Sequence, residues 1–290
     1  MRSLRLGVAL LERVKANVYA RERAEDWFMN AKNSHAQVNL DHMVVVVSDL
    51  EEAIENFSSL GFLVERGGVN GPTHNALIFF RDGTYIELIS TISPRTRAFF
   101  RLLCSTGIMS LLGKIRPSIT QRFYSWFSQP PGLRDWCFRT SSLDNTIEHL
   151  RANGIEALDA KQYSRTRPDG EVATWRLAGT LSRNLPFFIE DETPTEVRVP
   201  YKDACQHPNG VGGISAVVLP PDQGLKALQA LKHCNIVEST DGEECRIDGV
   251  AIRLADSPAA PVLALEVKSS GEPKGSLSSR LTSNALIEVV

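Results

Sequence analysis

Short apolar runs and an amphipathic helical pattern recur along this chain in a fixed order. In the first such segment, residues 37–92, the two apolar runs at its ends predict strands because they are rich in β-branched residues. Between them, apolar residues recur at helical spacing after Ser48 and Asp49, which are residue types that cap helices. Gly61 ends that pattern. The predicted order is β-α-β-β-β, with a strand at 40–47, a helix at 49–60 and strands at 62–65, 74–80 and 85–89.

The last two of these strands are joined by Asp82 and Gly83, a pair that favours a two-residue hairpin turn. With this pair at the centre of the turn, Ile78 lies opposite Glu87, and every second residue shares a face. We therefore expect His74 on the same face as Glu87, at the rim of any pocket that Glu87 lines. At about 3.3 Å per residue, His74 is too far along its strand to share an ion with Glu87.

The same pattern occurs again further along the chain. Residues 135–147 align without gaps on residues 42–54, and the strands that follow complete a second β-α-β-β-β unit within residues 133–200. A weaker, partial third unit is predicted at residues 207–268. Internal repetition outranks local patterns as a guide to architecture. The predicted fold class is therefore α+β, with repeated βαβββ modules that form a curved mixed sheet.

A long insertion at residues 93–132 separates the first two units. Its apolar residues have mostly helical spacing, and connections of this length usually carry their own structure or a function. We predict two short helices, broken near Pro117, that cover the mouth of the first unit's sheet and bring Phe99 and Trp126 against a substrate. The alternatives are a helical hairpin that closes a sheet edge and a homodimer surface.

The two ends of the chain lie outside the repeated units. Residues 1–36 begin with a basic amphipathic stretch of the kind found in mitochondrial presequences, but its acidic residues favour an N-terminal helical extension that packs on the protein, or a wrongly assigned start of the sequence. Residues 269–290 are rich in serine, glycine and lysine and predict a flexible tail, although residues 285–290 could add a strand. The predicted location is cytoplasmic, with the mitochondrion as the alternative.

Composition excludes several function classes without selecting one. The 290 residues are 42% hydrophobic and 23% charged, which is typical of a globular protein. A net charge of −2 gives no electrostatic reason to expect a nucleic-acid partner, and no apolar run reaches the length of a membrane span, so no membrane partner is expected. The five cysteines form no Cys-x-x-Cys pair, which indicates a reducing compartment rather than a disulfide framework or a structural zinc site.

His42 and Glu87 stand out because each interrupts an apolar strand, where a titratable side chain is costly without a partner or a function. In a functional site, the two could bind one metal ion. The structural alternatives are a neutral His42 bonded to the backbone and a Glu87 carboxylate paired with Arg139 or Arg176. Those two arginines, on predicted strands of the second unit, could otherwise hold a substrate carboxylate through two parallel hydrogen bonds.

A family resemblance is carried by five segments, residues 40–50, 73–77, 83–89, 185–190 and 207–210. They resemble the vicinal oxygen chelate superfamily, and in particular its glyoxalase-like branch. The resemblance covers about residues 38–267 and implies paired modules around a divalent metal, with ligands drawn from the first and last strand of each module. His42 and Glu87 match the two ligand positions of the first module.

The second module departs from that ligand pattern. Its first-strand position is Asp135, its last-strand position falls on Phe188, and Glu190 lies one side-chain alternation further along. We predict Glu87 and Glu190 as catalytic carboxylates and Asp135 as a substrate contact, with at least one of Asp135 and Glu190 in the cavity that Glu87 lines. For Glu190 the alternatives are a third metal ligand and merely the polar end of its strand. His207, which precedes a Pro-Asn-Gly turn, is a further candidate at the rim of the pocket.

Two function classes follow. In the first, a metal held by His42 and Glu87 chelates two adjacent oxygens of an apolar, carbonyl-containing metabolite and acts as a Lewis acid in a lyase, isomerase or dioxygenase reaction. Histidine and carboxylate ligands suit iron, manganese, nickel, zinc or cobalt. In the second, a metal-free protein binds and sequesters a hydrophobic metabolite. A third hypothesis makes the helical insertion a docking surface.

Overall fold

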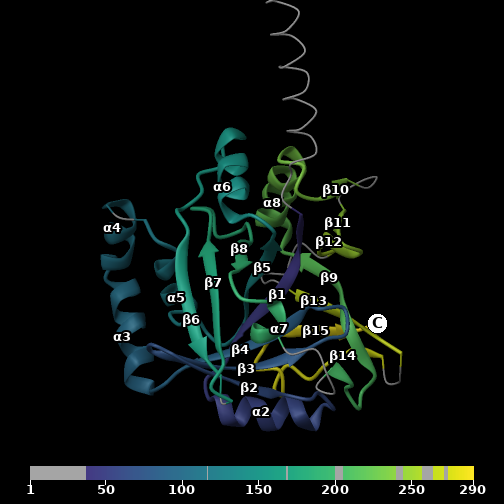
Figure 1. Cartoon of the computed structure of the whole chain (residues 1–290). Coiled ribbons are helices and arrows are strands. Elements are labelled where there is room, and N and C mark those ends of the chain that lie inside the picture. Colours follow the sequence, from purple (N-terminus) through teal and green to yellow (C-terminus); the bar gives the residue numbers. More distant parts are fainter. Residues whose placement is uncertain are drawn as a thin grey trace, which may run out of the picture. The chain divides into compact units, whose positions relative to one another are not determined.

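The described part of the chain forms two mixed β-sheets, one of eight strands and one of seven, with helices on their faces (Figure 1). This architecture confirms the α+β class predicted from the repeat. The computed structural model describes residues 37–115, 117–167, 169–199, 205–239, 244–256, 264–270 and 274–290. The predicted N-terminal extension at residues 1–36 lies outside these ranges.

The first unit has the predicted β-α-β-β-β order. Its first and last strands are parallel neighbours, with His42 beside Tyr85 and Val46 beside Ile89. Its helix begins where predicted, because the Asp49 carboxylate accepts a hydrogen bond of 3.0 Å from the backbone N–H of Glu52. The elements are β1 (Val38–Val46), α2 (Leu50–Ser59), β2 (Glu65–Asn70), β3 (Thr73–Phe79) and β4 (Tyr85–Thr91).

The predicted register between β3 and β4 is wrong by one residue. The turn contains three residues rather than two, since Gly83 is in the left-handed conformation with φ of 83° and Phe80 pairs with Thr84. Glu87 therefore lies opposite Leu77 instead of Ile78. Because side chains alternate, Glu87 shares its face with Asn75, and His74 belongs to the opposite face of the strand.

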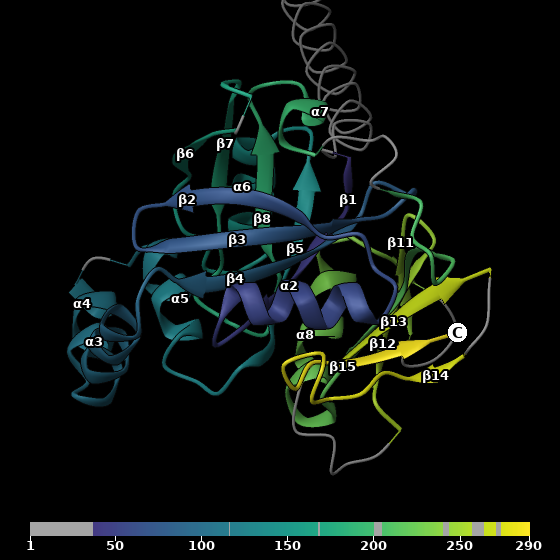
Figure 2. The ribbon, with the colours of Figure 1, turned by 90° about the horizontal axis from the view of Figure 1, so that it is seen from below.

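The second unit pairs with the first through their first strands. β1 and β5 (Gly132–Thr140) are antiparallel, with His42 beside Cys137. The eight-stranded order is β2-β3-β4-β1-β5-β8-β7-β6, and α2 lies across one face of this sheet (Figure 2). The other elements of the second unit are α6 (Leu143–Ala152), β6 (Lys161–Thr166), β7 (Val172–Ala178), β8 (Phe187–Asp191) and α7 (Thr195–Arg198).

The third unit is complete rather than partial, and the tail adds strands to its sheet. β9 (Val211–Leu219) and β12 (Val250–Leu254) are parallel neighbours, as β1 and β4 are in the first unit. β13 (Ala264–Ser269) is antiparallel to β9, as β5 is to β1. The strand that residues 285–290 could add is present as β15 (Leu286–Val289), which pairs with β13 because Ile287 and Val289 enter the core. The remaining elements are α8 (Pro221–His233), β10 (Glu238–Ser239), β11 (Cys245–Ile247) and β14 (Gly275–Ser276), and the order is β10-β11-β12-β9-β13-β15-β14.

The insertion forms three helices rather than the predicted two. They are α3 (Pro94–Ser105), α4 (Ile108–Ile115) and α5 (Ile119–Trp126). The predicted break near Pro117 is confirmed, and Ser118 starts α5 with a capping box. The additional break lies at Gly107, which has φ of 74°. α5 packs on the face of the first sheet opposite α2, so it can form one wall of a cavity there.

Candidate functional site

A cavity of about 290 Å³ lies between the first sheet and α5. Its walls are mainly apolar and aromatic. His42 and Glu87 supply polar atoms from β1 and β4, and Phe187 faces them from β8. From α5, Phe123, Tyr124 and Trp126 line the cavity, followed by Phe127.

A β-bulge directs two neighbouring polar residues toward the same site. The register between β1 and β5 skips Asp41, because Leu40 pairs with Phe138 and His42 with Cys137. As a result, the fully buried Asp41 carboxylate reaches Nδ1 of His42 at 2.8 Å, although the two residues are adjacent in the chain. His42 itself is 4% exposed.

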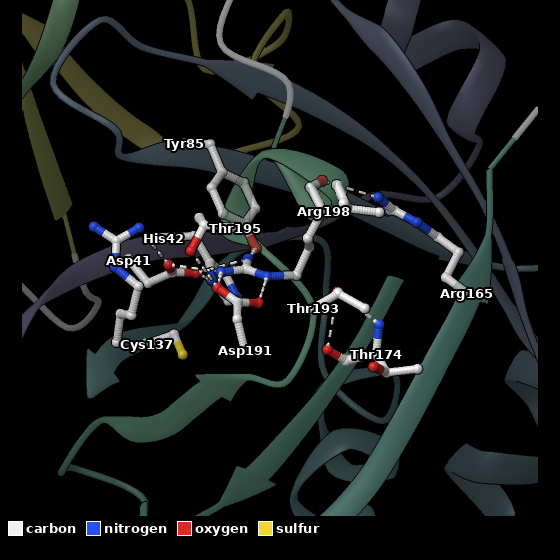
Figure 3. Close-up of polar contacts among 12 residues, drawn as sticks. Asp41, His42, Tyr85, Cys137, Arg165, Thr174, Asp191, Thr193, Thr195 and Arg198 are labelled. Atoms are coloured by element: carbon white, nitrogen blue, oxygen red, sulfur yellow. Dashed lines mark hydrogen bonds and ion pairs between the residues drawn. The ribbon is translucent and has the colours of Figure 1, made fainter. Parts of the chain in front are cut away.

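The buried Asp41 carboxylate is held by a cation from α7 (Figure 3). Arg198 donates to both oxygens of Asp41 at 3.0 Å, to the Tyr85 hydroxyl at 2.8 Å, and to Asp191. Burial by itself raises the pKa of Asp41, but the charge of Arg198 and the hydrogen bonds from His42 and Arg198 hold that pKa well below its ordinary value. Asp41 is therefore an ionised acceptor. It keeps the proton of a neutral His42 ring on Nδ1 and leaves the Nε2 lone pair free.

The free side of His42 faces Glu87. Nε2 of His42 lies 3.7 Å from Oε2 of Glu87. The other oxygen of that carboxylate accepts a hydrogen bond of 2.6 Å from the Asn75 amide. Gly67 on β2 makes room for this amide, since a Cβ atom at Gly67 would lie 2.1 Å from Oδ1 of Asn75. Hydrogen bonds thus orient both polar groups: Asp41 orients the His42 ring, and Asn75 orients the Glu87 carboxylate.

Aromatic rings enclose the His42 imidazole. The Tyr85 ring stacks on it at a centroid distance of 4.6 Å, and Phe187 meets it edge-on at 5.4 Å. Phe187 is the second module's counterpart of Glu87. Glu87 pairs with Val44, Phe187 pairs with Cys137, and the repeat aligns Cys137 with Val44. The assignment of that position to Phe188 is therefore wrong by one residue. Where the first module has a carboxylate, the second has a phenyl ring.

Asp135, the second module's counterpart of His42, is bound by the insertion. Arg122 on α5 donates to its two oxygens at 2.7 and 2.5 Å, and Trp126 Nε1 donates at 2.8 Å. Asp135 is 3% exposed and is not among the residues that line the cavity. Trp126, which donates to Asp135, does line it. Asp135 therefore acts as an anchor for α5 and does not reach the cavity.

Glu190 and the two predicted substrate-binding arginines, Arg139 and Arg176, do not line the cavity either. Glu190 accepts hydrogen bonds from Arg176 at 3.2 Å and from the Leu143 N–H at 3.3 Å, at the start of α6. Arg176 also binds Asp144, and Arg139 lies 3.5 Å from Asp41. None of the three lines the cavity. The expectation that Asp135 or Glu190 shares a cavity with Glu87 is wrong, and so is the pairing of Glu87 with either arginine.

His207 links the connection between α2 and β2 to the end of β3, and it does not line the cavity. Its Nδ1 accepts from the Leu63 N–H at 2.9 Å, and its Nε2 donates to the Phe79 carbonyl at 2.9 Å. Burial lowers the pKa of His207, in keeping with a neutral ring. Phe99 on α3 is 55% exposed and does not line the cavity, whereas His74 borders it.

Arg165, from β6, is a cavity residue that sequence patterns did not single out. It is 8% exposed and lines the cavity, and it donates to the Arg198 carbonyl at 3.1 Å. Its Nε has no hydrogen-bond partner, and among the described residues no carboxylate forms an ion pair with it, although the charge of Glu87 favours its charged form. Burial lowers its pKa, because the charge is poorly solvated there. Its strand, Lys-Gln-Tyr-Ser-Arg-Thr, looks like a polar edge strand, so no signal marked it.

Two groups of side chains could in principle hold a metal ion. Ligand atoms of Asp41, His42 and Cys137 lie within 4.8 Å of one another. However, Arg198 and His42 already occupy the oxygens of Asp41, and burial raises the pKa of the Cys137 thiol well above its ordinary value, which disfavours the thiolate that metals bind. His42 Nε2 and Glu87 Oε2 are the better donor pair. Both atoms face the cavity, and the other polar atom of each side chain is held by a hydrogen bond, from His42 to Asp41 and from Asn75 to Glu87.

Comparison with known proteins places this fold in a family. Residues 40–233 match the glyoxalase-like domain family. A hypothetical protein from Staphylococcus aureus is similar in structure, with a TM-score of 0.62 and 15% identity over 87% of this chain and 99% of that one. Comparison with curated proteins finds no match.

Enzymes of known name show weaker structural similarity. An extradiol ring-cleaving dioxygenase from B. fuscum has a TM-score of 0.45 and 12% identity, over 88% of this chain and 72% of its own. An Mn(II)-bound glyoxalase from Novosphingobium aromaticivorans has a TM-score of 0.37 and 12% identity, over 81% and 66%. The family match covers more than half of the sequence, and the paired βαβββ modules agree with it, so the chain belongs to the glyoxalase-like domain family.

Proposed function

We propose that this protein is an enzyme that acts on an apolar small molecule carrying a carbonyl and an anionic group. The observation that carries the proposal is the approach of His42 Nε2 to Glu87 Oε2, at 3.7 Å, inside an aromatic cavity. A surface pair of this kind would be solvated. Here His42 is buried and aromatic rings line the cavity, and a less polar surrounding strengthens polar interactions made within it.

The donor set fits a divalent ion held by two protein side chains. His42 and Glu87 would hold it, and the remaining coordination positions would be left to water and to two adjacent oxygens of the substrate. When bound, such an ion acts as a Lewis acid that stabilises negative charge developing on a carbonyl oxygen. The supporting residues keep both donors in place: Asp41 fixes the tautomer and orientation of His42, and Asn75 fixes the Glu87 carboxylate.

Arg165 defines the class of substrate. A buried guanidinium that forms no ion pair costs folding free energy, and an anionic group of the ligand would compensate its charge more fully than Glu87 does. A carboxylate is a good match for its planar N–H groups. Phe123, Trp126 and Phe187 would contact the apolar body of the substrate. The predicted substrate is therefore an apolar carboxylate with a neighbouring carbonyl.

A second candidate function is metal-free binding of the same class of ligand. It is favoured by the second module, where Phe187 and the Arg122-bound Asp135 occupy the positions that would complete a four-residue ligand set. The two candidates share one cavity and differ in whether His42 and Glu87 hold an ion.

Metal analysis of full-length protein, purified without chelators and reloaded with Mn²⁺, tests the enzyme proposal. We expect about one ion per chain, lost in Glu87→Gln and His42→Gln. Glu190→Gln is the matched control, because Glu190 lies in the same sheet, bound to Arg176, and should leave the ion in place. If wild-type protein retains no metal and binds no added Mn²⁺, the metal-free function replaces the enzyme proposal.

A further inference from the structure

The helix α4 presents its apolar side chains to solvent. Ile108, Leu111, Leu112 and Ile115 recur at i, i+3, i+4 and i+7, the spacing that forms one stripe along a helix. Such a stripe normally faces a protein core. In this structure all four residues are exposed, and Ile115 is 72% exposed. None of the described residues therefore buries the apolar stripe of α4.

The preceding helix, α3, also exposes apolar side chains. On α3, Phe100 is buried and stacks on Tyr124 at 4.4 Å, which fastens the helix to α5. Its neighbours Phe99 and Leu102 are 55% and 59% exposed. α3 and α4 lie together at one side of the first sheet (Figures 1 and 2). We call the six exposed residues the apolar face of the insertion: Phe99, Leu102, Ile108, Leu111, Leu112 and Ile115.

The same segment is strongly basic. Residues 92–134 contain seven basic residues and no acidic residue, whereas the whole chain has a net charge of −2. Arg95 and Arg101, both on α3, are exposed. The exposed apolar residues of α3 thus share their helix with two exposed arginines, in a segment that has no acidic residue; Arg122, by contrast, is buried against Asp135. The seven basic residues are Arg95, Arg97, Arg101, Lys114, Arg116, Arg122 and Arg134.

This combination distinguishes between the partners that could cover the apolar face. In a twofold dimer, the contact would bring identical positive segments together, and like charges repel at close range. A bilayer with anionic headgroups instead accepts apolar side chains at the boundary of its acyl chains and attracts Arg and Lys at its surface. None of the described helices has the length and apolar character needed to span a bilayer, so the contact would be peripheral.

We propose that the apolar face of the insertion docks on the surface of anionic lipid membranes. Phe99, Leu111 and Leu112 enter the headgroup boundary, and Arg95 and Arg101 contact lipid phosphates and carboxylates. The inference is independent of the chemistry at His42 and Glu87. It also differs from the expectation drawn from the sequence, because the absence of a spanning segment does not exclude a peripheral contact.

Co-sedimentation of the full-length protein with vesicles tests the proposal. Vesicles of phosphatidylcholine with phosphatidylserine should bind it, and binding should weaken as salt is raised. Leu111→Ser with Leu112→Ser should raise the apparent Kd at least about tenfold. Arg95→Gln with Arg101→Gln should weaken binding and flatten its salt dependence. The matched controls are Leu181→Ser with Leu225→Ser, and Lys226→Gln with Arg280→Gln, which change exposed residues elsewhere.

Three outcomes would overturn the proposal. The first is no binding of the wild-type protein to vesicles that contain phosphatidylserine. The second is unchanged binding of the Leu111/Leu112 variant when circular dichroism shows it to be folded, which would assign the contact to another basic segment such as residues 1–36. The third is a wild-type dimer in light scattering that the same variant converts to a monomer, which would make a second copy of the chain the occupant.

Discussion

Arg198 on α7 binds Asp41 on β1 through two hydrogen bonds of 3.0 Å, and both side chains are buried. The same guanidinium binds Asp191 at the end of β8. A residue that closes the second module thus neutralises a carboxylate of the first. Because Asp41 in turn orients His42, this ion-pair network connects the stability of the fold to the geometry of the cavity.

Removing Arg198 should destabilise the protein strongly. In Arg198→Met, the Asp41 charge is left buried without its main partner, and we expect the free energy of unfolding to fall by about 3–5 kcal/mol in urea denaturation. Arg139→Met, which alters a half-buried arginine 3.5 Å from Asp41, should cost less. Adding Asp41→Asn to Arg198→Met should recover part of the loss. Equal effects of the two single variants would contradict this role of Arg198.

Gly67 should control the Glu87 carboxylate through Asn75. In Gly67→Ala, the added Cβ would meet Asn75 Oδ1 at 2.1 Å, so the amide must move, and we expect its hydrogen bond to Glu87 to weaken. In calorimetric titration, the affinity for Mn²⁺ should fall by about 10- to 100-fold. Gly212→Ala is the control, because no heavy atom lies within 4 Å of the added Cβ. A similar affinity for both variants would rule out the Asn75 contact as a determinant.

Arg165 should contribute to ligand binding at a cost in stability. We expect Arg165→Gln to raise the free energy of unfolding by about 1 kcal/mol, because it removes a buried charge that has no ion-pair partner and that the charge of Glu87 compensates only in part. The same variant should lose the rise in melting temperature that benzoate produces in the wild-type protein. Benzyl alcohol, which has the same ring and no charge, should give little shift with either protein. A strongly destabilised Arg165→Gln would instead indicate a structural role.

His207 should make stability depend on pH. Because the pKa of His207 in the folded protein is below its ordinary value of 6.5, the unfolded chain takes up a proton first as the pH falls. The free energy of unfolding should therefore be unaffected by this group above about pH 7 and should decrease below about pH 6.5. His207→Asn should show a shallower decrease than the wild type between pH 6.5 and 5, and the exposed His233→Asn should not. Parallel curves for all three proteins would disprove the prediction.

Much of the fold could be predicted from the sequence, since each element carries its own periodicity. The apolar run at 40–47, the cap at Asp49 and the repeat at an offset of 93 residues are local features, and they led to paired βαβββ modules. His42 and Glu87 were identified because a titratable residue in an apolar strand is energetically unusual. The hairpin register failed because one glycine conformation, at Gly83, adds a residue to the turn and exchanges the two faces of β3.

The sequence by itself determined the modules and the His42–Glu87 pair, whereas only the tertiary structure decided which polar groups are free to act. Asp135 resembles a ligand in its own strand, but Arg122 from the insertion neutralises it. Arg165 resembles a surface residue in its strand, yet packing buries it in the cavity without a carboxylate. Charge pairing depends on contacts between residues far apart in the chain, and no local periodicity records those contacts.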